Sequence, residues 1–298
     1  MNAAAVAAPP ADVAPESRSP GQLAIRRFRK NRRALFCFWL LLTVGVATIV
    51  VPLVSPHTFY QQTLSRKKER PNASYWMGTD LNGRDLLVRC FYGGRISFAV
   101  GLVATFVSLL IGVGYGAIAG FLGGKTDLVL MRFVDVLYGL PHMFIVIIAM
   151  VIFGKSFLVV FMVLGLFGWM TMSRIVRGQV LSLKEKEFVE AARAMGADTA
   201  VIIWRHMIPN ILGPVIVYAT LTVPSVMLQE AFLSFLGLGI SEPMPSWGGL
   251  ISEGSGALNP LRIYWWLVVF PGSLLATTLF CLNAVGDGLR DAFDVQQR

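Results

Sequence analysis

The chain has 298 residues, of which 55% are hydrophobic and only 14% are charged, and its formal net charge is +9. Soluble proteins contain about 25% charged residues, so this composition excludes an ordinary soluble globular domain and predicts a protein with several membrane spans. The three cysteines are scattered and include no Cys-x-x-Cys pair, which argues against a disulfide framework and against a metal site.

The N-terminal segment comes first in chain order. Residues 1–22 are rich in Ala and Pro, and we expect them to be disordered. The basic cluster that follows, residues 26–33, precedes an apolar run longer than the 7–15 residues of a typical signal-peptide core. We therefore predict an uncleaved membrane anchor. Anionic membrane lipid would attract the basic residues, so the net charge requires no nucleic acid partner.

Spanning a hydrocarbon core of about 30 Å takes roughly 20 apolar residues in a helix. Six runs are of about this length: residues 34–54, 98–121, 137–154, 156–173, 211–229 and 263–286. The fifth run continues beyond Glu230 to residue 240. Only Lys155 separates the third and fourth runs, which together are too long for one span, so we expect a tight turn at Gly154-Lys155.

These runs predict an all-α, polytopic membrane protein with six transmembrane helices. The predicted parts are a cytoplasmic tail over 1–33, a first helix over 34–54, an extracytoplasmic loop over 55–97, a transmembrane domain over 98–290 that includes a polar cytoplasmic loop at 174–210, and a cytoplasmic tail over 291–298. Lys and Arg favour the cytoplasmic side. With the N-terminus inside, 17 of the 26 Lys and Arg residues are cytoplasmic, although the predicted outer loop holds seven of the other nine.

The outer loop contains a run of polar and glycine residues. The residues singled out are Gly78, Thr79, Asp80, Gly83, Arg84, Asp85 and Arg89. Their charges have i, i+4 and i, i+5 spacings, which favour ion pairs within a short surface helix. We expect these charges to brace the loop and not to contact a substrate.

Glycines in the second and third runs need separate interpretations. Gly112, Gly116 and Gly120 recur every four residues, so they share one helix face, where packing within the subunit is preferred over a moving gate.

The strings 124–126 and 154–156 resemble the end of a nucleotide-binding P-loop, but each lacks the preceding glycine and follows a membrane span instead of a strand. We expect no nucleotide site in this chain, so energy would come from another subunit or from an ion gradient.

The polar loop 174–210 has the pattern of two short helices. Ser182-Leu183-Lys184-Glu185 has the spacing of a capping box, and Gly196 suits the left-handed residue that ends a helix. Asp198 or Thr199 is expected to cap a second helix, and Pro209 to kink or stop it. An amphipathic projection of this kind on a membrane protein indicates a surface for a partner.

The last third of the chain holds one acid within an apolar run, Glu230. A position near a helix end or at a subunit interface is preferred over a substrate or proton role. The loop 241–262 is long and contains Trp247 and Gly248. We weigh two roles for it evenly, a solvated connector and a docking surface. The Trp265-Trp266 pair fits an aromatic belt at the membrane interface.

Several motifs together resemble a known family. Glu190, Ala191, Ala192 and Gly196, followed by Pro209, match the EAA loop of permease subunits of bacterial ABC importers. His206 stands where many members have Ile, as is usual in the peptide-permease branch. Residues 77–95, 230–248 and 286–291 resemble further signatures of the C-type permease subunits of oligopeptide importers, with dipeptide-importer subunits close behind. One departure is Val295, where the family commonly has Pro.

The resemblance implies a type I ABC importer permease fold in the bacterial inner membrane. It implies that the chain forms half of a peptide pathway with a homologous B-type permease subunit, and that two ATPase subunits and an extracytoplasmic peptide-binding protein complete the assembly. The residues implied to contact the ATPase are Glu190, Ala191, Ala192, Gly196, His206 and Pro209. Trp247 and Gly248 become candidates for docking the binding protein. N-inside topology fits, because the opposite choice would place the EAA loop away from any ATPase.

No covalent chemistry is expected of this subunit, and ATP and Mg²⁺ would be held by the partner ATPases, so this chain needs no cofactor. The alternatives are a dipeptide or metal-chelate importer of the same family, and a secondary carrier in which Glu230 would be the first residue to test. A membrane-embedded enzyme is disfavoured, because His57, His142 and His206 are isolated in the sequence and no catalytic or metal-binding cluster converges.

Overall fold

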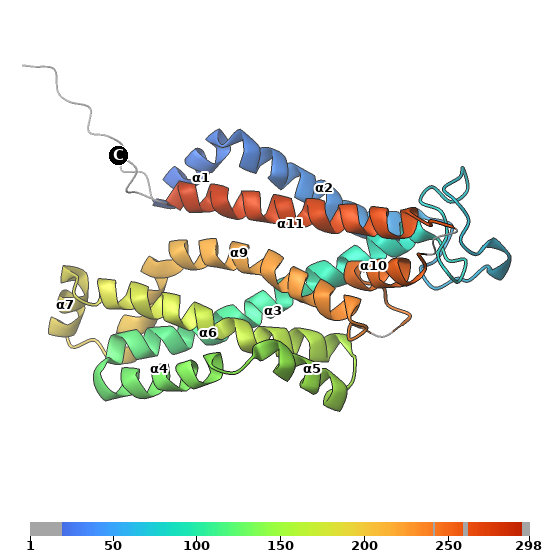
Figure 1. Ribbon diagram of the computed structural model, residues 1–298. Coiled ribbons are helices and arrows are strands. Elements are labelled where there is room, and N and C mark those ends of the chain that lie inside the picture. Colours follow the sequence, from blue (N-terminus) through green and yellow to red (C-terminus); the bar gives the residue numbers. More distant parts are fainter. Residues whose placement is uncertain (1–19, 241, 259–261, 294–298) are drawn as a thin grey trace, which may run out of the picture.

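The computed structural model describes residues 20–240, 242–258 and 262–293, and this part of the chain is nearly all helical, without a named strand (Figure 1). The elements are α1 Pro20–Lys30, α2 Arg32–Val54, η1 Leu64–Arg66, α3 Leu86–Leu122, α4 Gly124–Tyr138, α5 His142–Phe153, α6 Phe157–Leu183, α7 Glu187–Ala194, α8 Thr199–Val201, η2 Ile202–Met207, α9 Ile208–Phe235, α10 Trp247–Gly256 and α11 Trp266–Phe293. The all-α prediction is confirmed. The predictions for the tail before residue 20 and for Val295 lie outside the described residues.

Five continuous helices within the described residues are long and apolar enough to cross a membrane, namely α2, α3, α6, α8–α9 and α11. A sixth crossing requires α4 and α5 together, and these two helices are bent by 75° relative to each other. The predicted third span, 137–154, is therefore wrong in position, because the break at 139–141 lies inside it. The cause is Pro141, which disfavours the helical conformation at Leu140.

Helix α3 begins twelve residues before the predicted second span. The Asp85 side chain accepts a hydrogen bond from the backbone N–H of Leu87 at 2.9 Å and so caps its first turn. Arg89 and Arg95 lie within the helix, so the apolar run marks only part of it. In the same way, α11 ends at Phe293 and not at residue 286. The predicted outer loop is correspondingly shorter.

Helices α3 and α6 pack closely along the glycine stripe. A Cβ atom on Gly116 would lie 2.3 Å from the backbone oxygen of Ser173, and one on Gly112 would lie 2.6 Å from Cβ of Met172. Gly120 meets the backbone oxygen of Arg177, which a Cβ would approach to 2.9 Å. The predicted role of this stripe, packing within the subunit, is confirmed.

Two further features fix the arrangement of the helices. Gly154 has φ +87°, a conformation that favours glycine, and it forms the predicted turn between α5 and α6. Helices α1, α2 and α11 lie together along one side of the molecule (Figure 1). There Ala34 packs so closely on Gly288 that a Cβ on the glycine would lie 2.4 Å from Cβ of Ala34.

Candidate functional site

The EAA hairpin, residues 187–209, lies at one end of the molecule and the outer loop at the other (Figure 1). Helix α7 begins with Lys186 at its N-cap, without a side-chain cap. The predicted capping box is wrong, because Ser182 lies in the last turn of α6 and its hydroxyl donates to the backbone oxygen of Gln179 at 2.8 Å. Ser and Thr hydroxyls in helices often bond to a carbonyl of the preceding turn, which competes with capping.

Gly196 ends the first arm of the hairpin as predicted. Its φ is +77°. Its N–H donates to the backbone oxygen of Arg193 at 2.9 Å, and the N–H of Ala197 donates to that of Ala192 at 3.1 Å. This is the Schellman pattern of a helix C-terminus. A Cβ at Gly196 would meet nothing within 4 Å, so backbone conformation alone selects glycine here.

The two alanines of the EAA signature differ in burial. Ala192 and Val189 are buried within this chain, in a cluster with Phe121 and Met207, whereas Ala191 is exposed. The implied contact with an ATPase is therefore wrong for Ala192, whose side chain is covered by its own chain. Glu190 is exposed, as a contact residue has to be.

Sequence reasoning missed two apolar residues on the exposed side of α7. Phe188 is 38% exposed and Met195, just after the helix, is 79% exposed. With Ala191 they follow i, i+3, i+7 spacing, which places them on one helix face, beside the buried Val189 and Ala192. That spacing was the signal in the sequence. We call Phe188, Ala191 and Met195 the free face of the hairpin.

The return arm of the hairpin is continuous with a membrane span. Asp198 is the N-cap residue of α8 as predicted, although its side chain forms no cap hydrogen bond. A π-helical turn, η2, follows and leads directly into α9. Pro209 lies in the first turn of α9, so the predicted helix stop is wrong. His206 is half-buried, and its backbone oxygen accepts from the side-chain amide of Asn210 at 2.6 Å.

At the opposite end, the outer-loop motif folds back on itself. Gly78 and Gly83 adopt positive φ angles of 76° and 74°, and Thr79 pairs with Asp85 in an isolated antiparallel bridge. The predicted short surface helix is therefore wrong, because only Arg89 is helical and it belongs to α3. The turns depend on the positive φ angles of Gly78 and Gly83, which the spacing of the charged residues does not indicate.

The charges of this motif, buried in the case of Asp80, Arg84 and Arg89, form a cluster with more exposed glutamates of the loop after α9 and of α10. The charge cluster comprises Asp80, Arg84, Arg89, Glu242 and Glu253. Arg84 Nε lies 2.5 Å from Asp80 Oδ2, and Arg89, which also contacts Asp80, lies 2.7 Å from Glu253 Oε2. Burial alone would lower the pKa of the Arg84 guanidinium, but its contacts with Asp80 and the two glutamates raise that pKa above its usual value. Charge pairing that braces the loop is confirmed.

The histidine of the outer loop is not isolated, contrary to expectation. His57 Nδ1 lies 2.9 Å from Asp85 Oδ2, and its ring stacks on Tyr75 with centroids 4.8 Å apart. Within the described residues, no group of three or more His, Cys, Asp and Glu side chains is placed to hold a metal ion.

Trp247 and Gly248 lie inside the subunit. The Trp247 ring is fully buried, and its Nε1 donates to the backbone oxygen of Cys90 at 2.8 Å. A Cβ on Gly248 would lie 2.4 Å from Cα of Ala231. Neither residue lies on the surface, so their assignment as direct docking contacts is wrong. Part of the segment 241–262, which was expected to be a loop, forms helix α10. Trp266 is also buried, and only Trp265 is exposed enough for the predicted belt.

Glu230 is buried where α9 meets α3 and the start of α10. Ser234 donates to its carboxylate at 2.7 Å, and Ser97 lies at 3.3 Å from the other carboxylate oxygen. Glu230 lies near the C-terminal end of α9, as the preferred interpretation required, but its partners belong to the same subunit. Through the Ser97 hydroxyl, the Glu230 carboxylate links α9 to α3.

Comparisons with known proteins agree along nearly the whole chain. Residues 112–298 match the family described as "Binding-protein-dependent transport system inner membrane component", and residues 19–72 match "N-terminal TM domain of oligopeptide transport permease C". The chain is 46% identical to the oligopeptide transport system permease protein OppC of Haemophilus influenzae, over 95% of this chain and 91% of that protein. It is also 46% identical to OppC of Escherichia coli, with 95% and 93% covered.

A dipeptide relative and a solved structure complete the comparison. The dipeptide transport system permease protein DppC of Bacillus subtilis is 43% identical, over 93% of this chain and 86% of that protein. The fold is similar to a structure of the MetNI methionine ABC transporter in an inward-facing conformation, with a TM-score of 0.54 and 18% identity, over 67% of this chain and 94% of that chain.

Proposed function

Because the chain belongs to the inner-membrane components of binding-protein-dependent transport systems, we propose that it is the permease subunit of an ATP-driven importer of oligopeptides. The main support is the 46% identity to an oligopeptide permease over 95% of this chain. Such coverage includes the EAA hairpin, the charge cluster and every span, so the similarity is not confined to one motif.

The partners are a homologous B-type permease subunit, two ATPases and an extracytoplasmic peptide-binding protein. The subunit itself is non-catalytic and holds no cofactor, since ATP and Mg²⁺ bind to the ATPases. The EAA hairpin contacts one ATPase through Glu190 and the free face. Support comes from the exposure of the apolar residues Phe188 and Met195 beside Ala191, because adjacent exposed apolar groups mark protein interaction sites.

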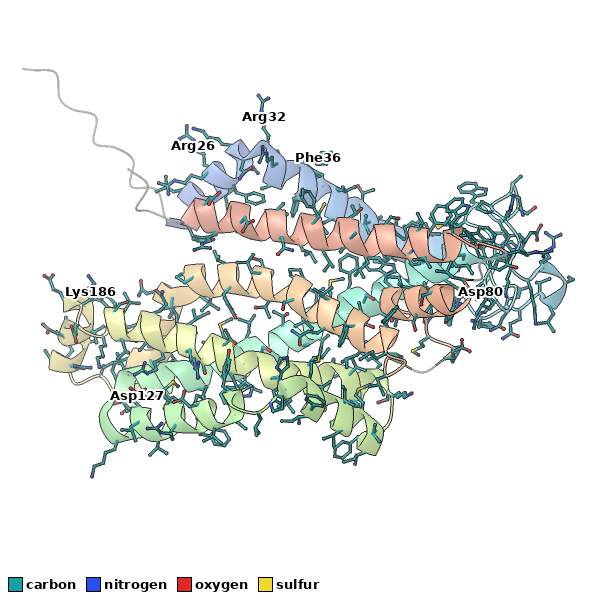
Figure 2. All side chains as sticks on the ribbon, in the orientation of Figure 1. Arg26, Arg32, Phe36, Asp80, Asp127 and Lys186 are labelled. Atoms are coloured by element: carbon teal, nitrogen blue, oxygen red, sulfur yellow. The ribbon has the colours of Figure 1, made fainter. Side chains whose placement is uncertain are left out.

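Both ends of the chain face the cytoplasm in this proposal. Arg26 and Arg32 lie at the same end of the molecule as Lys186, and Asp80 lies at the other end (Figure 2). Lys and Arg gather at the cytoplasmic end of membrane proteins, which supports placing the hairpin there. The charge cluster then lies on the extracytoplasmic side, where the binding protein delivers peptide.

Peptide uptake in cells whose other peptide importers are deleted tests the proposal. Accumulation of a labelled tripeptide should require ATP and the cognate binding protein, and should persist when the proton gradient is collapsed while ATP is maintained. Uptake that follows the proton gradient would overturn it and would make Glu230 the first residue to test in a secondary carrier.

A dipeptide importer is the second candidate, favoured by the 43% identity to DppC over 93% of the chain. Competition by unlabelled di-, tri- and tetrapeptides separates the two. A dipeptide that competes better than the longer peptides would select the second candidate.

A further inference from the structure

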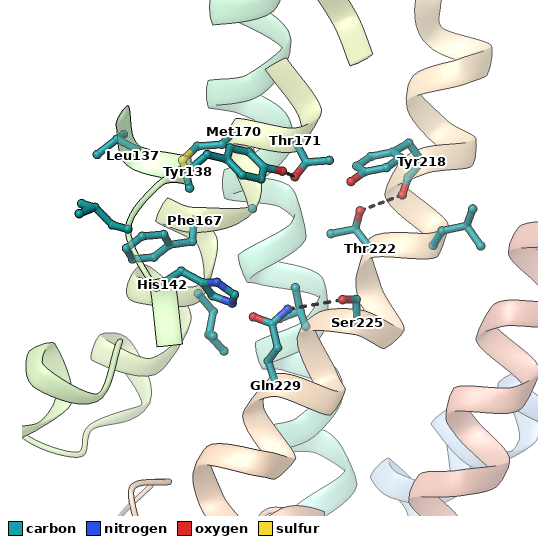
Figure 3. A pocket seen from close by; sticks show the side chains of 15 residues that line it. Leu137, Tyr138, His142, Phe167, Met170, Thr171, Tyr218, Thr222, Ser225 and Gln229 are labelled. Carbon is teal, nitrogen blue, oxygen red and sulfur yellow. Dashed lines mark hydrogen bonds between the residues drawn. The ribbon is translucent and has the colours of Figure 1, made fainter. Parts of the chain in front are cut away.

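A cavity of about 320 Å³ opens between the α4–α5 break, α6 and α9 (Figure 3). This volume is near the lower end of the range of about 300–1,000 Å³ that is usual for small-molecule sites. The break brings Tyr138, the last residue of α4, and His142, the first of α5, to the same wall of the cavity. The bend in the chain therefore places polar side chains inside the membrane region.

The facing wall is a polar stripe on α9. Tyr218, Thr222, Ser225 and Gln229 have i, i+4, i+7 and i+11 spacing, so they share one face of the helix. Polar side chains in a membrane span face the protein interior or a water-filled cavity and do not face lipid. The spacing in the sequence and the cavity in the structure thus identify the same surface.

The polar groups of the α9 wall are hydroxyl and amide groups, which act as neutral donors and acceptors. The Thr222 hydroxyl donates to the backbone oxygen of Tyr218 at 2.9 Å, which leaves its oxygen free to accept another hydrogen bond. Across the cavity, the Tyr138 and Thr171 hydroxyls bond to each other. Among the described residues that line the cavity, none is Asp, Glu, Lys or Arg. An ionic ligand would lack a counter-charge here.

The nearest ion pair lies beside the cavity. Arg174 pairs with Asp135 at 2.7 Å, and its guanidinium lies over the Tyr138 ring, 4.2 Å from the centroid. Both charged side chains are more than 40% exposed, so the pair lies on an open surface and not in the cavity wall. Neither charged residue lines the cavity, although the Arg174 guanidinium lies against the Tyr138 ring, which does.

We propose that this cavity binds the main chain of the transported peptide, with the hydroxyl and amide groups of α9 bonding to peptide N–H and C=O groups. The inference rests on the proposed function and adds to it the surface that contacts substrate. Peptide bonds are neutral and carry one donor and one acceptor at each residue, whatever the side chain. A wall of neutral partners therefore recognises peptides of varied sequence.

A double-mutant cycle between protein and peptide tests this contact. The variants are Thr222→Val and the matched control Thr220→Val, whose hydroxyl bonds to the backbone oxygen of Val217 and which does not line the cavity. Each variant is assembled in the full importer and assayed for uptake of trialanine and of its analogues N-methylated at one peptide bond. Any effect of N-methylation on the binding protein is common to all the variants and cancels.

Loss of one hydrogen bond corresponds to roughly a two- to ten-fold change in rate at low peptide concentration. We expect Thr222→Val to lower trialanine uptake by about five-fold and to abolish the further penalty of one N-methyl group. Thr220→Val should keep the wild-type penalty. An unchanged penalty in Thr222→Val would overturn the inference while leaving peptide import intact, whereas absence of peptide uptake in the wild type would overturn both.

A second measurement does not depend on the threonine variants. Ser225→Cys introduces a thiol into the cavity, while the three native cysteines are buried. In the full importer with binding protein and ATP, trialanine should slow labelling by a small thiol reagent several-fold, and free alanine should not. Equal labelling with and without trialanine would refute the contact.

Discussion

The charge cluster provides the sharpest test of the structure, through the variant Arg89→Gln. Arg89 is fully buried and contacts both Asp80 and Glu253. Removing one member of a buried ion pair costs about 3–5 kcal/mol, because the other charge is left without its partner. Asp80 keeps Arg84, and Glu253 is 29% exposed, so water offsets part of the loss. We therefore expect about 3 kcal/mol.

Hydrogen exchange of the outer loop measures this cost directly. The N–H groups of Lys68, Thr79 and Asp80 are bonded within the folded loop at 3.0 Å each. If they exchange through opening of the loop, a loss of about 3 kcal/mol corresponds to exchange faster by roughly 100-fold. Exchange in detergent-solubilised importer, followed by mass spectrometry of loop peptides, gives the ratio.

Arg174→Gln is the matched control, since it makes the same chemical change in an exposed pair. Exposed ion pairs contribute at most about 1 kcal/mol, and this one lies outside the outer loop. It should leave exchange of the loop amides within about two-fold of wild type. Loop exchange in Arg89→Gln that rises less than three-fold, or that the control matches, would refute the view that the cluster closes the loop.

Three further predictions concern the hairpin, the topology and the core. Gly196→Val forces a β-branched residue to φ +77°, which costs about 1 kcal/mol or more, so this variant should abolish stimulation of the ATPase by the loaded binding protein. The control Gly178→Val, at an exposed helical site, should not. Equal loss in both would contradict this. Single cysteines in the outer loop and in α7 should label from opposite sides with an impermeant reagent, and labelling from one side would show the topology wrong. Trp247→Phe, which loses the hydrogen bond to Cys90, should lower the free energy of unfolding by about 1 kcal/mol, and Trp247→Ala, which also leaves a cavity, by about 3–5 kcal/mol. Equal melting temperatures of the two variants would refute this.

The sequence allowed the helical class and the hairpin to be predicted, because both depend on local patterns. Apolar runs locate membrane helices, and Gly196 marks the end of α7 by its conformational freedom. The start of α3 was missed for a physical reason. Arg95 and Arg89 interrupt the apolar run. Arg95 donates to the backbone oxygens of Thr48 and Ile49, and Arg89 pairs with Asp80 and Glu253, so most of these partners are distant in sequence.

Burial within the subunit was the part that the sequence did not reveal. A small residue such as Ala192 suits a contact with a partner as well as one with Met207 of its own chain, and only the fold decides between them. The same holds for Trp247. The α4–α5 break differs, because Pro141 stood in the sequence and the average hydropathy of the run concealed its effect.

Helix α3 gives the molecule a mechanical property. Its 37 unbroken residues correspond to a length of about 55 Å, well beyond a hydrocarbon core of about 30 Å. Near one end Arg89 anchors it in the charge cluster, and near the other the Arg193 guanidinium of the hairpin lies over the ring of Phe121 at 5.1 Å. The helix is thus one continuous element that joins the two ends of the molecule. If the hairpin contacts an ATPase as proposed, a displacement of the hairpin that leaves α3 straight would also tilt the far loop, without a chain of intermediate rearrangements.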